Sequence, residues 1–179
     1  MSDAKRKVTI GIIGSGGYGG TARRFLRNTG EFNIVGCMDV DEDTARRAAQ
    51  EDDARAYTDL DQMLANEKME SVSINTPVLL HCEHTRRALE AGKHVFITKP
   101  ITNNSAEARE LVELADRKDL AYMVGHHARH ATLAHYTEEL LEGGELGRVC
   151  NAVVTCASSA GLEQETGDWR VEPGKNPGG

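Results

Sequence analysis

The sequence contains no long apolar run. No stretch approaches the roughly 18 consecutive apolar residues of a membrane-spanning helix, so we predict no membrane partner. The first seven residues carry charge, but the apolar stretch 8–13 that follows is too short for the hydrophobic region of a signal peptide. That stretch is better interpreted as a strand, and the pattern indicates a cytoplasmic protein.

The sequence also lacks an excess of basic residues. Its 21 Lys and Arg residues against 28 Asp and Glu residues give a net charge of −7 and a pI near 5.5. Binding to nucleic acid needs a basic surface, so we expect no nucleic-acid partner. The length of 179 residues allows one full domain and a modest second piece.

The cysteines show no C-x-x-C spacing. There are four of them, at Cys37, Cys82, Cys150 and Cys156. Cys37 and Cys82 fall inside predicted secondary-structure elements, where reduced thiols that are buried or half-buried are the ordinary outcome. The sequence therefore does not indicate a disulfide framework.

A glycine motif follows the apolar stretch 8–13 and precedes a helix-like segment. Strand, tight turn and helix N-terminus together can hold a pyrophosphate on free backbone N–H groups. Gly14 permits the turn, Gly16 lets a phosphate approach the backbone, and Gly19 lets the helix pack closely on the strand. Glycine-rich turns are also common without any ligand, but the flanking strand and helix favour a dinucleotide site. The predicted cofactor-binding loop is Gly14, Ser15, Gly16, Gly17, Tyr18 and Gly19.

An acidic residue ends the next predicted strand. Asp39 follows the apolar segment 32–38, about 20 positions beyond the glycine motif, where a carboxylate accepts hydrogen bonds from an adenosine ribose. A carboxylate there repels a 2′-phosphate, and the following Val40 and Asp41 offer no arginine to bind one. We therefore predict NAD as cofactor, with NADP less favoured. The alternatives are NADP use and a solvated aspartate in a turn.

Strand and helix signals alternate through the first 124 residues. This pattern predicts a doubly wound parallel α/β sheet of the Rossmann type. After residue 124 the pattern changes to one helix over 132–142 and one strand over 148–158, which cannot bury a core alone. We therefore assign 1–124 to a dinucleotide-binding domain and 125–179 to the beginning of an incomplete second domain. The predicted strands of the first domain cover 7–13, 32–39, 54–57, 70–75, 94–98 and 120–124.

Two further strand ends carry polar residues. Asn75, Thr76 and Pro77 end the strand 70–75, and Lys99 ends the strand 94–98 before Pro100. Open α/β sheets bind ligands at the carboxyl ends of their strands, so both segments are candidates for the site. The structural alternative is that Thr-Pro only terminates a strand and that Lys99 is a solvated lysine before a proline.

Histidines cluster after the last predicted strand of the sheet. His126 and His130 are four residues apart, a spacing that lets two histidines on a helix share a metal. No cysteine or carboxylate completes an evident ligand set, so we predict no metal. Substrate-pocket residues are the better interpretation for His126 and Arg129, with a solvated helix start as the alternative.

The order of these motifs resembles the Gfo/Idh/MocA oxidoreductases, which are glucose–fructose oxidoreductase-like and inositol dehydrogenase-like enzymes. The resemblance covers residues 7–150, and its most specific part is the segment 91–100. It rests on the glycine motif, Asp39, Asn75-Thr76-Pro77 with His81 four positions after the proline, Ala91-Gly92-Lys93-His94-Val95, Lys99-Pro100 and Gly125-His126-x-x-Arg129.

The resemblance implies an NAD(P)-binding domain followed by an α/β substrate domain. It implies hydride transfer between nicotinamide and a sugar, polyol or related hydroxyl-bearing metabolite. Lys99 is then the catalytic residue, lying near the nicotinamide and the substrate and assisting proton transfer. The segment Asn75-Thr76-Pro77, together with His81, Lys99 and Pro100, is expected to bind the cofactor.

The chain departs from the family in two places. Thr98 stands where the family usually has Glu before the lysine. The chain also ends at Gly178-Gly179, about where the family continues into a helix with an Asp and a His of the active site, which leads us to expect a truncated member. The alternative functions are a catalytically inactive dinucleotide-binding fragment and a homo-oligomer in which another chain supplies the missing sheet.

Overall fold

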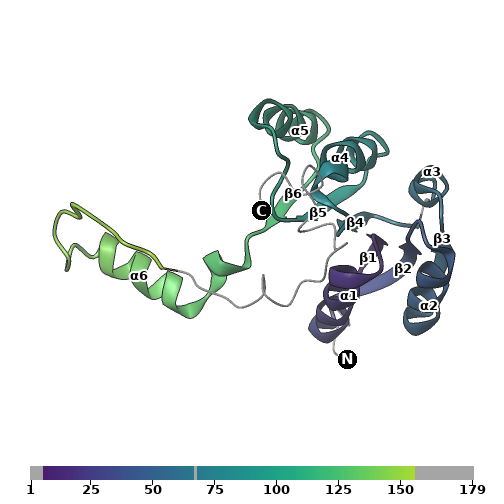
Figure 1. Ribbon diagram of the computed structural model, residues 1–179, viewed down its shortest axis with the longest axis horizontal. Coiled ribbons are helices and arrows are strands. Elements are labelled where there is room, and N and C mark those ends of the chain that lie inside the picture. The colour runs from purple at the N-terminus through teal and green to yellow at the C-terminus, as the bar shows by residue number, and fades with distance from the viewer. Residues whose placement is uncertain (1–5, 67, 156–179) are drawn as a thin grey trace, which may run out of the picture. The chain divides into compact units, whose positions relative to one another are not determined.

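The computed structural model describes residues 6–66 and 68–155 (Figure 1). By its internal contacts the chain divides into two units, Met1–Gly125 and His126–Gly179. Among the described residues, no helix has both the length and the apolar character needed to cross a membrane.

The first unit is built on a six-stranded parallel sheet. Its strand order is β3-β2-β1-β4-β5-β6, so the chain starts in the middle, moves to one edge and returns to build the other half. This order confirms the predicted doubly wound α/β fold. The strands are β1 (Val8–Ile13), β2 (Phe32–Met38), β3 (Arg55–Tyr57), β4 (Ser71–Ile74), β5 (His94–Thr98) and β6 (Tyr122–Gly125).

Helices connect the strands and cover both faces of this sheet. Because parallel connections are right-handed, the helices on the way out to β3 cover one face, and those on the way back cover the other. Contacts agree with this: α1 packs on β1 and β2, α2 packs on β2 and β3, and α4 packs on β4, β5 and α5. The helices are α1 (Gly17–Thr29), α2 (Glu42–Asp52), α3 (Leu60–Leu64), the short 3-10 helix η1 (Val78–Leu80), α4 (His81–Glu90) and α5 (Ser105–Arg117).

Alternating side chains of the central strand β1 feed two hydrophobic clusters. Ile10 and Ile12 join the cluster beside α2, while Ile13 joins the cluster beneath α3, α4 and α5. Gly11 and Gly36 are paired across β1 and β2, and the side chains of Met63 and Met69 lie over this bare stretch of backbone. The sheet is therefore buried on both faces, as a parallel sheet requires.

Short polar side chains and a glycine set the helix boundaries. Asp41 caps α2 by accepting a hydrogen bond from the Thr44 N–H at 2.8 Å, and Asp59 caps α3 in the same way from Gln62 at 2.8 Å. Gly30 ends α1 with a φ of 70°, a left-handed conformation that glycine adopts without steric cost. These boundaries agree with the stop and start signals in the sequence.

The second unit contains the 3-10 helix η2 (His127–His130) and the helix α6 (Thr132–Glu142). The predicted helix 132–142 is confirmed. The predicted strand 148–158 is wrong over 148–155, where no strand forms; residues 156–158, with Cys156, lie outside the described residues. A β-branched segment becomes a strand only when neighbouring backbone pairs with it, and the described part of this unit provides no such neighbour.

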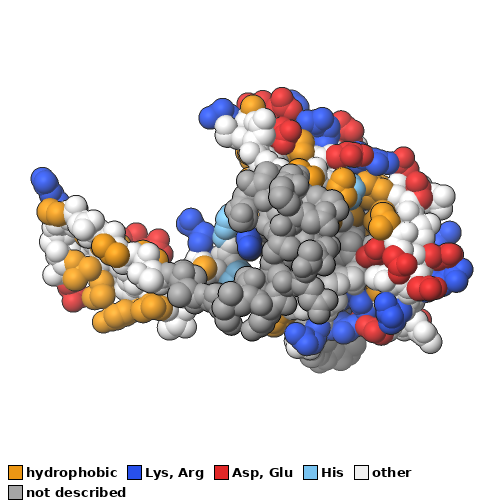
Figure 2. Space-filling model, viewed as in Figure 1, with side chains coloured by type: hydrophobic (Ala, Val, Ile, Leu, Met, Phe, Trp, Pro, Cys, Tyr) orange, Lys and Arg blue, Asp and Glu red, His pale blue; other side chains and the backbone are white. Residues whose placement is uncertain are grey.

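Apolar side chains stay exposed in this second unit. Figure 2 shows hydrophobic side chains along α6 and the segment after it, whereas acidic and basic side chains intermix over the helices of the first unit. The exposed apolar residues include Leu133, at 74% exposure, together with Tyr136, Leu141, Leu146 and Val149. The described part of this unit therefore offers no partner that covers the apolar side chains of α6.

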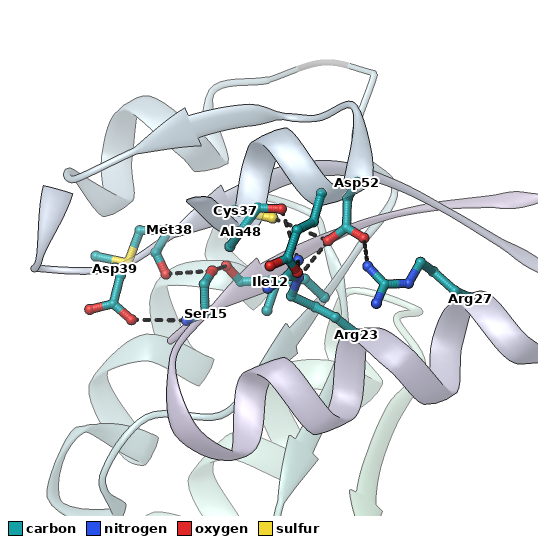
Figure 3. A network of polar contacts seen from close by, with 10 residues as sticks. Ile12, Ser15, Arg23, Arg27, Cys37, Met38, Asp39, Ala48 and Asp52 are labelled. Carbon is teal, nitrogen blue, oxygen red and sulfur yellow. Dashed lines mark hydrogen bonds and ion pairs between the residues drawn. The ribbon is translucent and has the colours of Figure 1, made fainter. Parts of the chain in front are cut away.

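A buried ion-pair network joins α1 to α2 (Figure 3). Arg23 donates from Nε to Asp52 at 2.5 Å, and its Nη2 donates to the Ala48 carbonyl at 2.9 Å and to Glu51 at 2.7 Å. Arg27 pairs with the other oxygen of Asp52. The side chains of Arg23 and Asp52 are only 4% and 1% exposed, so both buried charges depend on the ion pairs of this network for compensation.

We expect Asp52→Asn to lower the free energy of unfolding by about 3 kcal/mol, because it leaves a buried guanidinium without its main partner. Urea unfolding followed by circular dichroism measures the change. Asp43→Asn, at an exposed position of the same helix, is the matched control. Equal, small losses in the two variants would contradict the importance of the buried pair.

Candidate functional site

The glycine loop brings the end of β1 and the start of α1 into direct backbone contact. Gly14 and Gly17 have φ values of 80° and 43°, a region that residues with a side chain rarely adopt. A Cβ atom on Gly19 would lie 1.9 Å from the Gly14 carbonyl oxygen, so only glycine fits there. The helix begins without a side-chain cap and without an acidic residue in its first turn. Its N-terminus is thus suited to an anion.

Asp39 lies against this loop. One of its carboxylate oxygens, Oδ2, accepts hydrogen bonds from the N–H groups of Ser15 and Gly16, both at 3.0 Å. The other, Oδ1, accepts from the Asp41 N–H at 3.2 Å. Asp39 is therefore half-buried and oriented by the loop, and it is not a freely solvated turn residue. Its negative charge is fixed beside the place where α1 begins.

Ser15 anchors the loop to the strands beneath it. Its hydroxyl donates to the Met38 carbonyl at 3.0 Å (Figure 3), and the loop N–H of Gly14 donates to that carbonyl at 2.9 Å. Cys37 is buried one residue earlier on β2, and burial raises the pKa of its thiol to about 12. This thiol is therefore protonated at neutral pH and serves as packing, as the sequence predicted for a buried cysteine.

Asn75 and Thr76 follow β4 and touch the glycine loop from the other side. A Cβ on Gly14 would lie 3.0 Å from both the Asn75 carbonyl carbon and the Thr76 Cγ2. The Asn75 amide donates to the Ser73 carbonyl at 3.2 Å and to the Ser73 hydroxyl at 3.1 Å. Its Oδ1 is buried and has no hydrogen-bond partner among the described residues. An orphaned buried acceptor at a strand end fits a ligand that brings a donor.

Lys99 ends β5 on the same edge of the sheet. Lys99, Pro100 and Pro77 are exposed, as are Gly17 and Tyr18 at the start of α1. The Thr98 hydroxyl donates a hydrogen bond to the Ile74 carbonyl at 3.3 Å, which links the end of β5 to the end of β4. The sheet thus brings the predicted residues of four neighbouring strand ends to one edge, in the order β2, β1, β4 and β5.

His81 is placed differently from these exposed residues. Its imidazole is 1% exposed, and its two ring nitrogens face the carbonyl oxygens of Pro100 at 2.7 Å and Thr76 at 2.9 Å. His84, one turn further along α4, has its Nδ1 3.2 Å from the Thr76 hydroxyl. Sequence reasoning missed His84, although its spacing of three from His81 on a helix places both on one face.

His126 and Arg129 belong to the second unit. His126 precedes η2 and Arg129 lies within it, and both side chains are exposed. Their role in binding substrate stays a prediction. Within residues 6–66 and 68–155, no three His, Cys, Asp or Glu side chains gather in a way that could hold a metal ion.

Comparison with known proteins finds sequence similarity to oxidoreductases. The family model described as "Oxidoreductase family, NAD-binding Rossmann fold" (GFO_IDH_MocA) matches residues 8–126. A dTDP-3,4-didehydro-2,6-dideoxy-alpha-D-glucose 3-reductase of Saccharopolyspora spinosa is 30% identical, over 81% of this chain and 44% of its own length. A D-xylose 1-dehydrogenase (NADP(+)) of Hypocrea jecorina is 35% identical, over 63% of this chain and 29% of its own.

A solved structure shows the same fold. The crystal structure of an NAD binding oxidoreductase from Klebsiella pneumoniae superposes with a TM-score of 0.73 at 27% identity, covering 79% of this chain and 40% of that one. The chain thus spans less than half the length of these relatives.

We expect Gly19→Ala to destabilise the protein by about 3 kcal/mol, because the new methyl group collides with the Gly14 carbonyl and the loop must move. Gly20→Ala is a matched control in the next residue of α1, where a Cβ meets nothing within 4 Å. It should stabilise by about 0.5 kcal/mol, since alanine is the better helix former. Thermal unfolding of both variants measures whether each substitution stabilises or destabilises the protein. A change in stability of the same sign in both variants would contradict the close approach of Gly19 to Gly14.

His81 and His84 also predict a pH dependence of stability. Burial lowers the pKa of both imidazoles below the ordinary value of 6.5. The unfolded chain therefore takes up protons at a pH where the folded chain does not, so the free energy of unfolding falls as pH drops below about 6.5. Urea unfolding at pH 7.5 and 5.5 should show a larger loss for the wild type than for His84→Gln. Equal losses of unfolding free energy in the wild type and in His84→Gln would contradict a contribution of the buried His84 to this pH dependence.

Proposed function

The chain belongs to this oxidoreductase family with an NAD-binding Rossmann fold, and we propose that it is an NAD-dependent dehydrogenase. Its substrate is a sugar, polyol or related metabolite that carries a hydroxyl group. The observation that carries the proposal is the edge formed by the carboxyl ends of β2, β1, β4 and β5, where Asp39, the glycine loop, Asn75 and Lys99 follow one another.

The adenosine half of the cofactor is assigned to the first two of these strand ends. The N–H groups at the start of α1 hold the pyrophosphate, and the bare backbone at Gly16 lets it approach. The Asp39 carboxylate, held by the Ser15 and Gly16 N–H groups, accepts hydrogen bonds from the ribose hydroxyls. Its fixed negative charge disfavours a 2′-phosphate, which is the ground for choosing NAD over NADP.

The nicotinamide half is assigned to the ends of β4 and β5. The buried Asn75 Oδ1, which has no partner among the described residues, accepts a hydrogen bond from the cofactor. When bound, the cofactor supplies the hydride acceptor or donor. The neutral amine of Lys99 takes the proton released by the substrate hydroxyl during oxidation, and the ammonium returns it during reduction. His126 and Arg129 contribute to the substrate pocket.

The named activities of the relatives support the substrate class. One is named as a xylose dehydrogenase and another as a reductase of a nucleotide-linked sugar, and both names specify sugar substrates. The second candidate function is dinucleotide binding without turnover. It is supported by the placement of every proposed cofactor residue within the unit Met1–Gly125. Cofactor binding with no turnover of any polyol would favour this second function.

Two variants of Asp39 test the cofactor assignment. Asp39→Ala should weaken NAD binding about tenfold, because the ribose hydroxyls and two loop N–H groups lose their acceptor. Asp39→Asn keeps an acceptor oxygen but loses the charge. It should therefore narrow the preference for NAD over NADP and retain a higher NAD affinity than Asp39→Ala does. Isothermal titration with both dinucleotides measures these changes.

Asp43→Ala removes an exposed carboxylate from the nearby first turn of α2 and is the control, expected to bind as the wild type does. Unchanged NAD binding in Asp39→Ala would show that the ribose assignment is wrong.

A further inference from the structure

The side chain of His81 bridges two turns that are far apart in sequence. Thr76 belongs to the turn after β4 and Pro100 to the turn after β5, and their carbonyl oxygens lie 2.9 Å and 2.7 Å from the two ring nitrogens. Both ring nitrogens are thus directed at the protein's own backbone. With 1% of the residue exposed, the imidazole offers no free nitrogen to a ligand at the sheet edge.

Thr76 is held by α4 at a second point. The His84 ring nitrogen lies 3.2 Å from the Thr76 hydroxyl, so the first turn of α4 contacts both the backbone and the side chain of this residue. His84 is 8% exposed, and Val78 between Thr76 and α4 is also buried. The turn after β4 is therefore fixed from below by buried contacts, while the neighbouring Pro77 stays exposed at the surface.

The bridge requires a side chain with a hydrogen-bond donor. Both partners are carbonyl acceptors, and a neutral imidazole donates one hydrogen while an imidazolium donates two. Burial lowers the pKa of His81, although the contacts with Pro100 and Thr76 act in the opposite direction. A neutral ring donates to one of the two turns and packs against the other, whereas an imidazolium donates to both. An apolar side chain of similar size fills the space but donates to neither.

The two residues that His81 contacts are each directly preceded by a residue assigned to the nicotinamide half of the cofactor. Asn75 directly precedes Thr76, and Lys99 directly precedes Pro100. We infer that His81 is a positioning residue that locks the turn carrying Lys99 against the turn carrying Asn75, and that it does so without contacting the cofactor. The inference rests on the proposed function for the identity of the ligand, but the bridge itself is a property of the protein alone.

Two ligands of different reach test the inference in the full chain. ADP extends only over the glycine loop and Asp39, whereas NADH extends further, to the ends of β4 and β5. In His81→Leu we expect ADP affinity within about twofold of the wild type and NADH affinity about tenfold weaker, since a small displacement of positioned groups has effects of this size or larger. His81→Gln, which keeps an N–H donor, should recover part of the NADH affinity. Isothermal titration measures both.

His94→Gln is the matched control for His81→Gln, because it changes an exposed histidine at the amino end of β5, on the opposite edge of the sheet. It should leave both affinities unchanged. Equal losses of ADP and NADH affinity in His81→Leu, or no loss of either, would overturn the positioning role. A wild type that binds neither ligand would instead contradict the proposed function.

Hydrogen exchange of the ligand-free protein tests the bridge independently of any cofactor. In His81→Leu, amide exchange should accelerate over 75–80 and 98–103 and stay unchanged over 14–19. That local pattern supports the bridge even where no dinucleotide binds. Acceleration over the whole sheet, or no acceleration in either turn, overturns it.

Discussion

The contact between Gly19 and the Gly14 carbonyl is the constraint on which the site depends. A Cβ at Gly19 would lie 1.9 Å from that oxygen, so the helix α1 can lie this close to β1 only because one residue has no side chain. The close approach keeps the turn between β1 and α1 tight. The loop N–H groups of Ser15 and Gly16 then reach the Asp39 carboxylate, so one steric constraint sets the geometry of the candidate site.

Charges on either side of this loop have different surroundings and different consequences. Asp39 is half-buried and oriented by backbone N–H groups, which suits a carboxylate that selects among ligands. Asp52, the last residue of α2, is buried against Arg23 in the middle of α1, and its oxygens are used within the protein. The first charge remains accessible for recognition, and the second fixes α1 against α2.

Side chains of α4 and β5 contact the turns after β4 and β5 and hold their backbone in place. His81 and His84 hold Thr76, His81 also reaches the Pro100 carbonyl, and Thr98 donates to the end of β4. Exposed residues such as Lys99 and Pro77 thus sit on turns whose backbone is fixed by buried contacts. In this arrangement the exposed groups are free for chemistry while their positions are set by residues that are buried.

The sequence by itself determined the strands and helices of the first unit, their alternation and the residues at most strand ends, because each follows from short-range signals. Each of these signals lies within a short segment of the chain. Examples are the alternating strand and helix patterns, the glycine motif, Asp39 after an apolar run and the cap at Asp41. The tertiary structure alone decided what distant segments do to each other. In the folded protein both ring nitrogens of His81 face backbone carbonyls, those of Thr76 and Pro100. Residues 148–155 do not form the strand that their β-branched side chains predict. Hydrogen bonds between distant turns and strand pairing depend on which backbone lies alongside, and a local pattern carries no information about that neighbour.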